Sequence, residues 1–279
     1  MAVINTNTGA LYAQQAMTTN ARGLATVMQQ LSTGKRINNA VDDVAGMAIS
    51  TRLTSQIRGL NQAIRNTNDG ISLIQTAEGA TDQVTNMLQR MRELAVQASN
   101  DTNNTQDRSF LDLEFQALTS QIDNIANYTQ WNGADVLNQK GGTSGVFRFQ
   151  VGANSGQTIS ITFSNMTTQA NKGVLSDIQS KNITGTVTAS AALGVIISAL
   201  DTVSLSRSNM GAVISRLQFT SDNLANVSAK AQESRSRIED TDYSQATTEL
   251  AKRNIIQQAA QAMLAQANQA PQLVLQLLR

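Results

Sequence analysis

The feature that most constrains the fold is a series of apolar residues spaced alternately three and four positions apart. The first series begins at Leu53 and changes phase once, at Ala77. Such spacing places its members on one stripe of a helix that supercoils against partner helices. The change of phase indicates one local adjustment of winding within a single helix of about fifty residues. The members are Leu53, Ile57, Leu60, Ile64, Thr67, Ile71, Ile74, Thr81, Val84, Leu88, Met91, Ala95 and Ala98.

Two further stripes with the same spacing predict two more helices. One lies within residues 111–125, between the polar loop at 100–107 and the turn signal Asn132-Gly133. The other lies within residues 193–224. Because no such helix can hide its apolar face alone, we expect a mainly α fold, a long antiparallel coiled-coil helical bundle. Each well-buried Leu or Ile contributes about 1.5 to 3 kcal/mol, so the bundle should fold as a monomer.

The centre of the chain alternates apolar and polar side chains around a Gly- and Asn-rich connection. The apolar members are Phe147, Phe149, Val151, Ile159, Ile161 and Phe163. Alternation of this kind predicts a small central β-hairpin region, which we expect at the end of the bundle farthest from the chain termini. Residues 182–189 could add a strand, and KGGTSG at 140–145 is typical of a flexible linker.

Both chain ends have thinner apolar stripes, and neither Met1 to Ala21 nor Asn254 to Leu278 contains a charged residue. The stripes are Ile4, Leu11, Leu24 and Leu31, and then Ile256, Ala260, Met263, Ala267, Ala270, Val274 and Leu277. Seams with so many small residues bury little area against a backbone entropy of about 1 to 2 kcal/mol per residue. We therefore expect both ends to be loose in the monomer and ordered on association. Pro271 should kink or interrupt the last helix.

Composition excludes several functions. The chain has no His and no Cys, which removes Ser/His/Asp and Cys/His catalysis, His- or thiolate-bound zinc, and disulfides. A net charge of +1 gives no electrostatic reason to expect nucleic acid as a partner. The first residues lack a secretory signal pattern, and the glutamines of the last stretch oppose membrane insertion, since each would need a hydrogen-bond partner in lipid. We expect no cofactor.

Three short motifs suggest chemistry only weakly. Asp42 and Asp43 lie between Gly34 and Gly46, where a helix joint with a solvated Asp pair is favoured over a metal or acid/base site because no further ligands accompany the pair. TGKR lacks the spacing of a phosphate-binding loop. DTNNTQD lacks the Gly and the closing Glu of a calcium loop.

Four separated motifs closely resemble bacterial flagellin. They are LSTGKRINNAVDDVAGMAIS at 31–50, QRMRELAVQASN at 89–100, SRSRIEDTDY at 234–243 and LAQANQAPQLVLQLLR at 264–279. The resemblance covers the chain up to about residue 140 and again from about residue 190. This chain departs from the family in its short centre, in Trp131 where Phe is usual, and in an extra Lys252-Arg253 pair.

The resemblance implies a structural subunit of the flagellar filament, secreted and extracellular, that assembles with copies of itself. It implies export in an unfolded state through the flagellar type III gate, and as partners an export chaperone, the filament cap and the hook-filament junction proteins. It also implies three regions: residues 1–44 with 236–279 as an inner coiled coil lining the lumen, 45–140 with 190–235 as the helical bundle, and 141–189 as a short variable β-hairpin segment.

The resemblance also assigns roles to individual residues. The contact with the host Toll-like receptor for flagellin would include Gln89, Arg90, Glu93, Leu94 and Glu114. The segment bound by the export chaperone or by cytosolic immune sensors would include Val274, Leu275, Leu277 and Leu278. The polymerisation helices would carry Leu11, Leu24, Leu31, Ile256, Met263, Val274 and Leu277. Gly34, Asp42, Asp43 and Gly46 would join the inner and outer helical layers.

Two alternatives stay open at this point. One is a hook-filament junction protein or another secreted coiled-coil flagellar component. The other is an enzyme, as in flagellins whose central insert carries a zinc protease; that enzyme needs the motif H-E-x-x-H, which a chain without histidine cannot supply.

Overall fold

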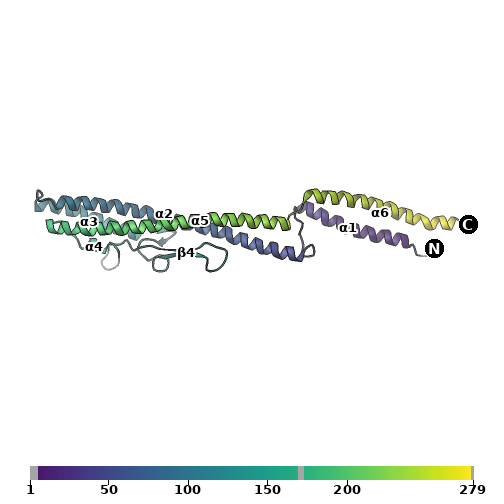
Figure 1. The fold of residues 1–279 in the computed structure, drawn as a ribbon, viewed down its shortest axis with the longest axis horizontal. Helices are drawn as coiled ribbons and strands as arrows, with labels where there is room; N and C mark the ends of the chain where they lie inside the picture. Colours follow the sequence, from purple (N-terminus) through teal and green to yellow (C-terminus); the bar gives the residue numbers. More distant parts are fainter. Residues whose placement is uncertain (1–5, 169–172, 278–279) are drawn as a thin grey trace. The chain divides into compact units, whose positions relative to one another are not determined.

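The computed structural model describes the fold of residues 6–168 and 173–277, and the side chains of the last helix as far as residue 269. The elements follow one another as α1 (Thr8–Thr33), α2 (Val44–Ala98), α3 (Thr105–Tyr128), β1 (Gln130–Trp131), β2 (Ala134–Asp135), β3 (Val146–Gln150), β4 (Thr158–Thr162), α4 (Ser176–Gln179), α5 (Thr186–Glu239) and α6 (Tyr243–Leu277) (Figure 1). The fold is mainly α with small β-hairpins, as the sequence predicts.

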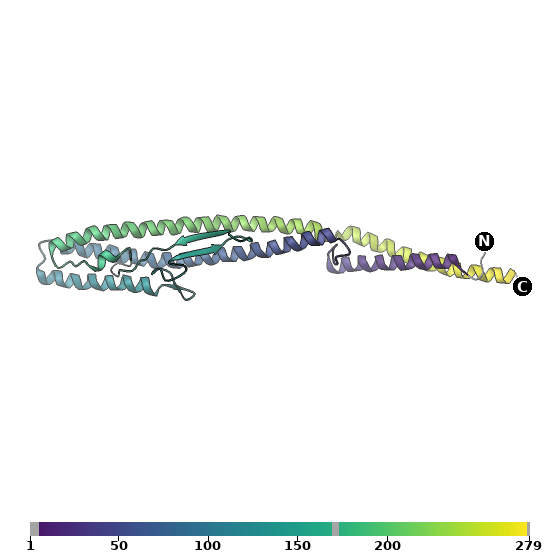
Figure 2. The same ribbon diagram turned by 90° about the horizontal axis from the view of Figure 1, so that it is seen from below.

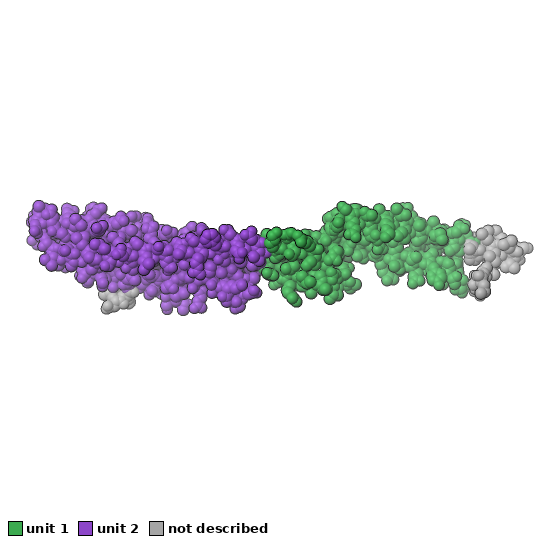
Figure 3. Space-filling model, viewed as in Figure 1, with its two compact units in different colours: residues 1–57, 229–279 green, residues 58–228 purple. Residues whose placement is uncertain are grey.

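The chain forms two compact units, which Figure 3 distinguishes by colour. We call residues 58–228 the bundle unit, and residues 1–57 with 229–279 the terminal unit. The helices are interrupted at residues 34–43 and 240–242, close to the region boundaries expected at 44 and 236. The division of the assembled subunit into an inner coiled coil and an outer bundle stays a prediction.

The main hydrophobic core of the bundle unit is made by α2, α3 and α5, which lie side by side (Figure 2), and a small second cluster contains Leu60, Ala63 and Leu224. The largest fully buried side chains that α2 and α3 contribute to the main core are Ile74, Leu88, Met91, Leu94, Phe115 and Ile122. The stripe predicted from residue 53 onward is therefore the buried face of α2, a single helix of 55 residues. The stripe also contains two threonines, Thr67 and Thr81, whose hydroxyls donate to the carbonyls of Ala63 and Ala77 at 2.7 and 2.6 Å. The core therefore tolerates them, because their polar groups are bonded.

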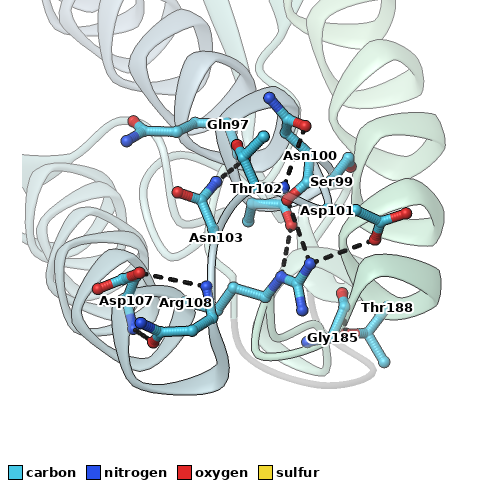
Figure 4. A network of polar contacts seen from close by, with 12 residues as sticks. Gln97, Ser99, Asn100, Asp101, Thr102, Asn103, Asp107, Arg108, Gly185 and Thr188 are labelled. Carbon is cyan, nitrogen blue, oxygen red and sulfur yellow. Dashed lines mark hydrogen bonds and ion pairs between the residues drawn. The ribbon is translucent and has the colours of Figure 1, made fainter.

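In the polar loop between α2 and α3, side chains form hydrogen bonds with backbone groups at the end of α2 and the start of α3 (Figure 4). Asn104 and Asp107 form a capping box at the start of α3. Arg108 Nε donates to the carbonyl of Ala98 at 2.9 Å, and Arg108 Nη2 donates to the carbonyl of Asn100 at 3.1 Å. The last carbonyls of α2 lack partners within their own helix, so the guanidinium replaces the water that would otherwise bind there. Asp101 lies 3.5 Å from the same guanidinium.

Both predicted turn and hairpin signals are confirmed. Asn132 and Gly133, with φ of 48° and 79°, connect β1 to β2 by a two-residue turn of the kind that Asn-Gly favours. Strands β3 and β4 pair antiparallel, with Phe147 opposite Ile161. Phe147 also packs edge-to-face on the buried Phe163, with ring centroids 5.6 Å apart.

The hairpin lies elsewhere in the bundle unit than expected. It runs alongside α2, where Asn66 Nδ2 donates to the carbonyl of Gln150 at 3.1 Å. The ring of Phe149 lies so close to Gly70 that a Cβ there would come within 3.0 Å of it. The end of the bundle is instead formed by the turn at residues 99–104. Close approach at Gly70 is the physical reason, since a larger residue would keep the strand away from the helix.

Two further expectations for the central segment are wrong. Residues 140–145 are not a flexible linker, because Gly145 N–H donates to the carbonyl of Gly141 at 3.0 Å and Thr143 N–H to that of Val146 at 3.1 Å. Residues 182–189 add no strand; α5 begins at Thr186 instead. The β-branched residues there favour a strand locally, but Ala189 and Ala192 are fully buried with helical spacing, and this packing decides the conformation.

Helix α6 continues through Pro271 to Leu277, so the break considered at that proline does not occur. Among the described residues, α5 is the one helix long and apolar enough to cross a membrane by length and composition, with a window of mean hydropathy 1.6. A core helix of a bundle has the same composition, and α5 contributes Val203, Met210 and Leu217 to the core.

Candidate functional site

Helices α1 and α6 form an antiparallel pair within the terminal unit. Asn7 Nδ2 donates to the carbonyl of Ala267 at 2.8 Å, and Asn20 Nδ2 donates to that of Arg253 at 2.9 Å. The Tyr243 hydroxyl donates to the carbonyl of Leu31 at 3.3 Å. Residue numbers thus rise along one helix as they fall along the other, which fixes the register of the pair over most of its length.

The contact surface between α1 and α6, which we call the seam, is thin. Only Asn20 and Val27 of α1 are buried, and Ala246 is the buried residue of the described part of α6. The partly buried positions are Ala10, Ala13, Met17, Gly23, Leu24, Gln30 and Leu31 of α1, and Glu249, Leu250, Arg253, Gln257, Ala260, Leu264 and Ala267 of α6. Small and polar residues fill more than half of these positions, so the pair buries little apolar area.

The predicted polymerisation residues divide between the seam and the exposed surface. Leu24 and Leu31 lie on the seam, whereas Leu11, Ile256 and Met263 are 58%, 41% and 64% exposed. The predicted stripe of α6 is therefore only partly right: Ala260 and Ala267 lie on the seam, but the seam also includes Arg253 and Gln257, which are not apolar and so do not belong to an apolar stripe. The side chains of the other two polymerisation residues, Val274 and Leu277, lie outside the described part of α6. In the predicted chaperone segment, the side chain of Leu275 also lies outside that part, and Leu278 lies outside the described residues.

The outer surface of the pair carries exposed large apolar side chains among Gln, Thr, Asn and Ala. These large apolar side chains are Leu11, Tyr12, Met28, Ile255, Ile256 and Met263. Exposed apolar side chains on helices that bury little of themselves are typical of surfaces that associate.

A polar cluster lies within the seam. Asn20 is 6% exposed, and Arg253 Nε forms an ion pair with Glu249 Oε1 at 3.0 Å. Gly23 makes room for this guanidinium, because a Cβ there would overlap it. A polar residue at a single seam position specifies the register of paired helices at some cost in stability. Arg253, one of the departures from the family pattern, thus belongs to the seam.

The segment joining α1 to α2, residues 34–43, packs against residues 239–242 in the terminal unit; we call this the joint. Gly34 ends α1 with φ of 71°, a left-handed conformation that favours glycine, and its carbonyl accepts from Thr241 N–H at 2.9 Å. Arg36 N–H donates to the carbonyl of Glu239 at 2.6 Å. Gly34 thus lies where α1 ends, and its role in joining inner and outer helical layers stays a prediction.

The two aspartates of the joint cap backbone groups instead of being simply solvated. Asp42 Oδ2 accepts from the N–H groups of Asn38 and Asn39 at 3.0 and 2.8 Å. Asp43 Oδ1 accepts from Gly46 N–H at 2.8 Å, at the start of α2. No cluster of three or more His, Cys, Asp or Glu side chains that could hold a metal occurs among the described residues.

Glu239 holds three segments of the terminal unit together. Lys35 Nζ lies 2.5 Å from its carboxylate, and the buried Ser50 hydroxyl donates to it. The hydrogen bond from Lys35, followed by that from Ser50, lowers the pKa of the Glu239 carboxyl below its ordinary value. Sequence reasoning missed this residue, because Lys35 and Glu239 are far apart in the chain.

The lowered pKa predicts that the joint weakens in acid. The charged carboxylate contributes its full stabilisation above the ordinary glutamate pKa of about 4.3, and this contribution is lost as the pH falls through the lowered pKa. Hydrogen-exchange protection of the Arg36 and Thr241 amides should therefore fall below about pH 4. Glu239→Gln should remove most of this pH dependence, while Glu249→Gln, which leaves the joint intact, should not. Equal pH profiles for the two variants would contradict the assignment.

A second surface, on α2 and α3 of the bundle unit, contains the predicted receptor residues. Arg90 Nε lies 2.8 Å from Glu114 and Arg90 Nη1 lies 3.0 Å from Glu93, and all three side chains are about half exposed or more. The hydrogen bonds that Arg90 donates to Glu114, and then to Glu93, raise the pKa of Arg90. Gln89 is exposed beside them. Leu94 requires correction: it is 1% exposed and belongs to the bundle core, because its position lies on the buried stripe of α2.

A helical bundle whose two chain ends pair and leave large apolar side chains exposed is typical of a subunit that associates with further helices. The sequence pattern of the bacterial flagellin N-terminal helical region matches residues 4–141, and that of the C-terminal helical region matches residues 193–278. The chain therefore belongs to the bacterial flagellin family.

Individual relatives agree with this assignment. Flagellin of Halalkalibacterium halodurans is 47% identical over 99% of this chain and 100% of its own length. Flagellin of Bacillus subtilis is 41% identical over 99% of both chains. A crystal structure of Bacillus cereus flagellin matches with a TM-score of 0.50 and 30% identity, covering 57% of this chain and 88% of that one. The chain is thus a structural subunit of the extracellular flagellar filament, of a short form, and not an enzyme.

Proposed function

We propose that this subunit polymerises through its terminal unit, with α1 and α6 becoming the inner coiled coil of the filament. The observation that carries this proposal is the contrast within the α1–α6 pair. Its seam buries few residues, while Leu11, Tyr12, Ile255 and Met263 stay exposed on the outside. Copies of the same chain that cover this face would supply the missing burial, and non-closing contacts between copies produce an open helical polymer.

The absence of charge supports a position around the lumen. Residues 6–21 of the described N-terminal region and residues 254–269 of α6 contain no Asp, Glu, Lys or Arg. A channel through which unfolded protein passes should be wetted without fixed charges, because charges would retain segments of opposite sign. Glutamine and asparagine supply hydrogen bonding without such a field.

Further partners follow from the family. We propose export in an unfolded state through the flagellar type III gate, with a chaperone bound at Val274 to Leu278, and growth beneath the filament cap above the junction proteins. The alternative is a junction protein, which would not elongate. Purified protein seeded with filament fragments should grow long filaments visible by electron microscopy, and a failure to elongate from any seed would favour the alternative.

The Arg90 surface is proposed as the contact with the host Toll-like receptor for flagellin. Arg90→Glu should lower receptor signalling by monomer about tenfold, equivalent to about 1.4 kcal/mol of binding, because it reverses a charge at the centre of the exposed Glu93–Arg90–Glu114 cluster. The measurement is a dose-response curve in receptor-expressing cells. Leu94→Asp is unsuitable, since it would place a charge in the core.

Two control variants distinguish a direct receptor contact of Arg90 from an effect of its ion pair on the fold. Arg207→Glu breaks another ion pair of the bundle unit, with Asp82 at 3.2 Å, and should leave signalling unchanged. The exchange Arg90→Glu with Glu114→Arg restores an ion pair within the chain but reverses what the receptor meets. Receptor signalling by this exchanged variant should stay weak. Recovery of signalling would show that the ion pair acts structurally and that the contact proposal is wrong.

A further inference from the structure

Two methionines differ from the others in their exposure. The chain has nine methionines, and Met91, Met166 and Met210 are buried at 0–1% exposure in the bundle core. Met28 and Met263 are 56% and 64% exposed. They are the exposed methionines of the described part of the chain, and both belong to the terminal helix pair.

Both side chains lie beside the seam and not in it. Met28 follows the buried Val27 in α1, and Met263 precedes the seam residue Leu264 in α6. By the register that the Asn7–Ala267 bond sets, Met263 lies at the level of the exposed Leu11 and Tyr12. The two thioethers thus belong to the exposed outer surface of the helix pair, which the proposed assembly would cover.

The chemistry of an exposed thioether is oxidation. The chain contains no cysteine, so no thiol competes for a two-electron oxidant. With hydrogen peroxide, a lone pair of the methionine sulfur attacks one peroxide oxygen and the O–O bond breaks. A sulfur–oxygen bond forms, and the other oxygen leaves as water after proton transfer. Sulfur is oxidised by two electrons, peroxide is reduced, and an apolar side chain becomes a polar sulfoxide.

We propose that Met28 and Met263 are oxidation sites through which peroxide blocks assembly of the free subunit. The inference rests on the proposed function, because a sulfoxide opposes polymerisation only if this face is buried between copies. A sulfoxide is larger and more polar than the thioether, and burying its oxygen costs free energy wherever the packed contact places no hydrogen-bond donor beside it. In the bundle core, the buried methionines are shielded from the oxidant, so mild oxidation leaves the fold intact.

The test treats full-length unassembled protein with dilute hydrogen peroxide under native conditions. Peptide mass spectrometry should find the added oxygen atom first on Met28 and Met263, and later on Met91, Met166 and Met210. Circular dichroism and Trp131 fluorescence should be unchanged at that stage. Seeded polymerisation, followed by light scattering, should be slowed at least about tenfold relative to the untreated sample.

Variants assign the effect to these two sulfurs. Met28→Leu with Met263→Leu removes both thioethers, and each protein is compared with its own untreated sample, so any change in basal assembly cancels. The double variant should lose most of its sensitivity to peroxide, whereas Met91→Leu should keep it. Equal sensitivity of the double variant and the parent would overturn the proposal, as would full assembly of protein oxidised at both positions.

The two proposals can fail separately. If untreated protein does not polymerise, the proposed function is wrong. If untreated protein polymerises and oxidised protein does so equally well, only the present inference is wrong. Filaments treated after assembly add a direct check, since Met28 and Met263 should then react more slowly than in the monomer; equal rates would refute burial of this face.

Discussion

A chain ending at Asn254 is expected to keep its folded bundle and to form no filaments. The deletion removes most of α6, including the seam residues Gln257, Ala260 and Leu264 and the exposed Ile255, Ile256 and Met263. The hydrophobic core of the bundle unit lies between Leu73 and Leu217, so the deletion removes none of it. Filament formation is scored by electron microscopy and sedimentation after seeding, and the fold by circular dichroism.

A full-length variant separates loss of the surface from loss of length. Ile255→Asp with Met263→Asp places two charges on the exposed face of α6 and should also abolish assembly, because neither charge finds a partner in an apolar contact. Lys230→Ala, an exposed change on α5 that leaves this face intact, should assemble normally. Filaments from the truncated chain, or a bundle that unfolds upon truncation, would each contradict the proposed separation of roles.

The second large effect is expected in the bundle core. Phe115 is fully buried on α3 at the contact of the three long helices, so Phe115→Ala should lower the free energy of unfolding by about 3 to 5 kcal/mol. Phe110, on the same helix and 59% exposed, is the matched control, and Phe110→Ala should change stability by about 0.5 kcal/mol or less.

Urea denaturation measures both variants. Helix content and the fluorescence of Trp131, the single tryptophan, which packs against the core, report the same unfolding transition. A shift of the midpoint that is equal for the two variants would mean that α3 is not held by the core as the structure shows. A small shift for both would mean that the bundle relaxes around the cavity.

Elements with a strong period were predictable from sequence. The stripes beginning at Leu53, Leu111 and Leu193 each form the buried face of a long helix. They were predictable because a helical period of about 3.6 residues depends only on residues that are close together in the sequence. The hairpin at β3 and β4 was predictable for the same reason, with period two. The Asn132-Gly133 turn followed from local backbone preference.

Predictions failed where local preference and long-range packing disagree. Residues 182–189 favour a strand by composition, but the first turns of α5 bury alanines in the core there. The glycines at 140–145 suggest flexibility, but backbone hydrogen bonds hold them. Leu94 was assigned to a receptor contact by family likeness, although its place on the α2 stripe is a core position.

By itself, the sequence determined the presence and buried faces of the three long bundle helices, the hairpin, the flagellin family and the absence of histidine- and cysteine-based chemistry, because each depends on residue identity or on neighbours along the chain. Only the tertiary structure decided which face of α6 meets α1, how Asn20 and Arg253 fit the seam, and how Glu239 joins Lys35 and Ser50. The physical reason is that a helix can turn about its own axis without changing its period. Contacts between residues distant in the chain then select the face that is buried.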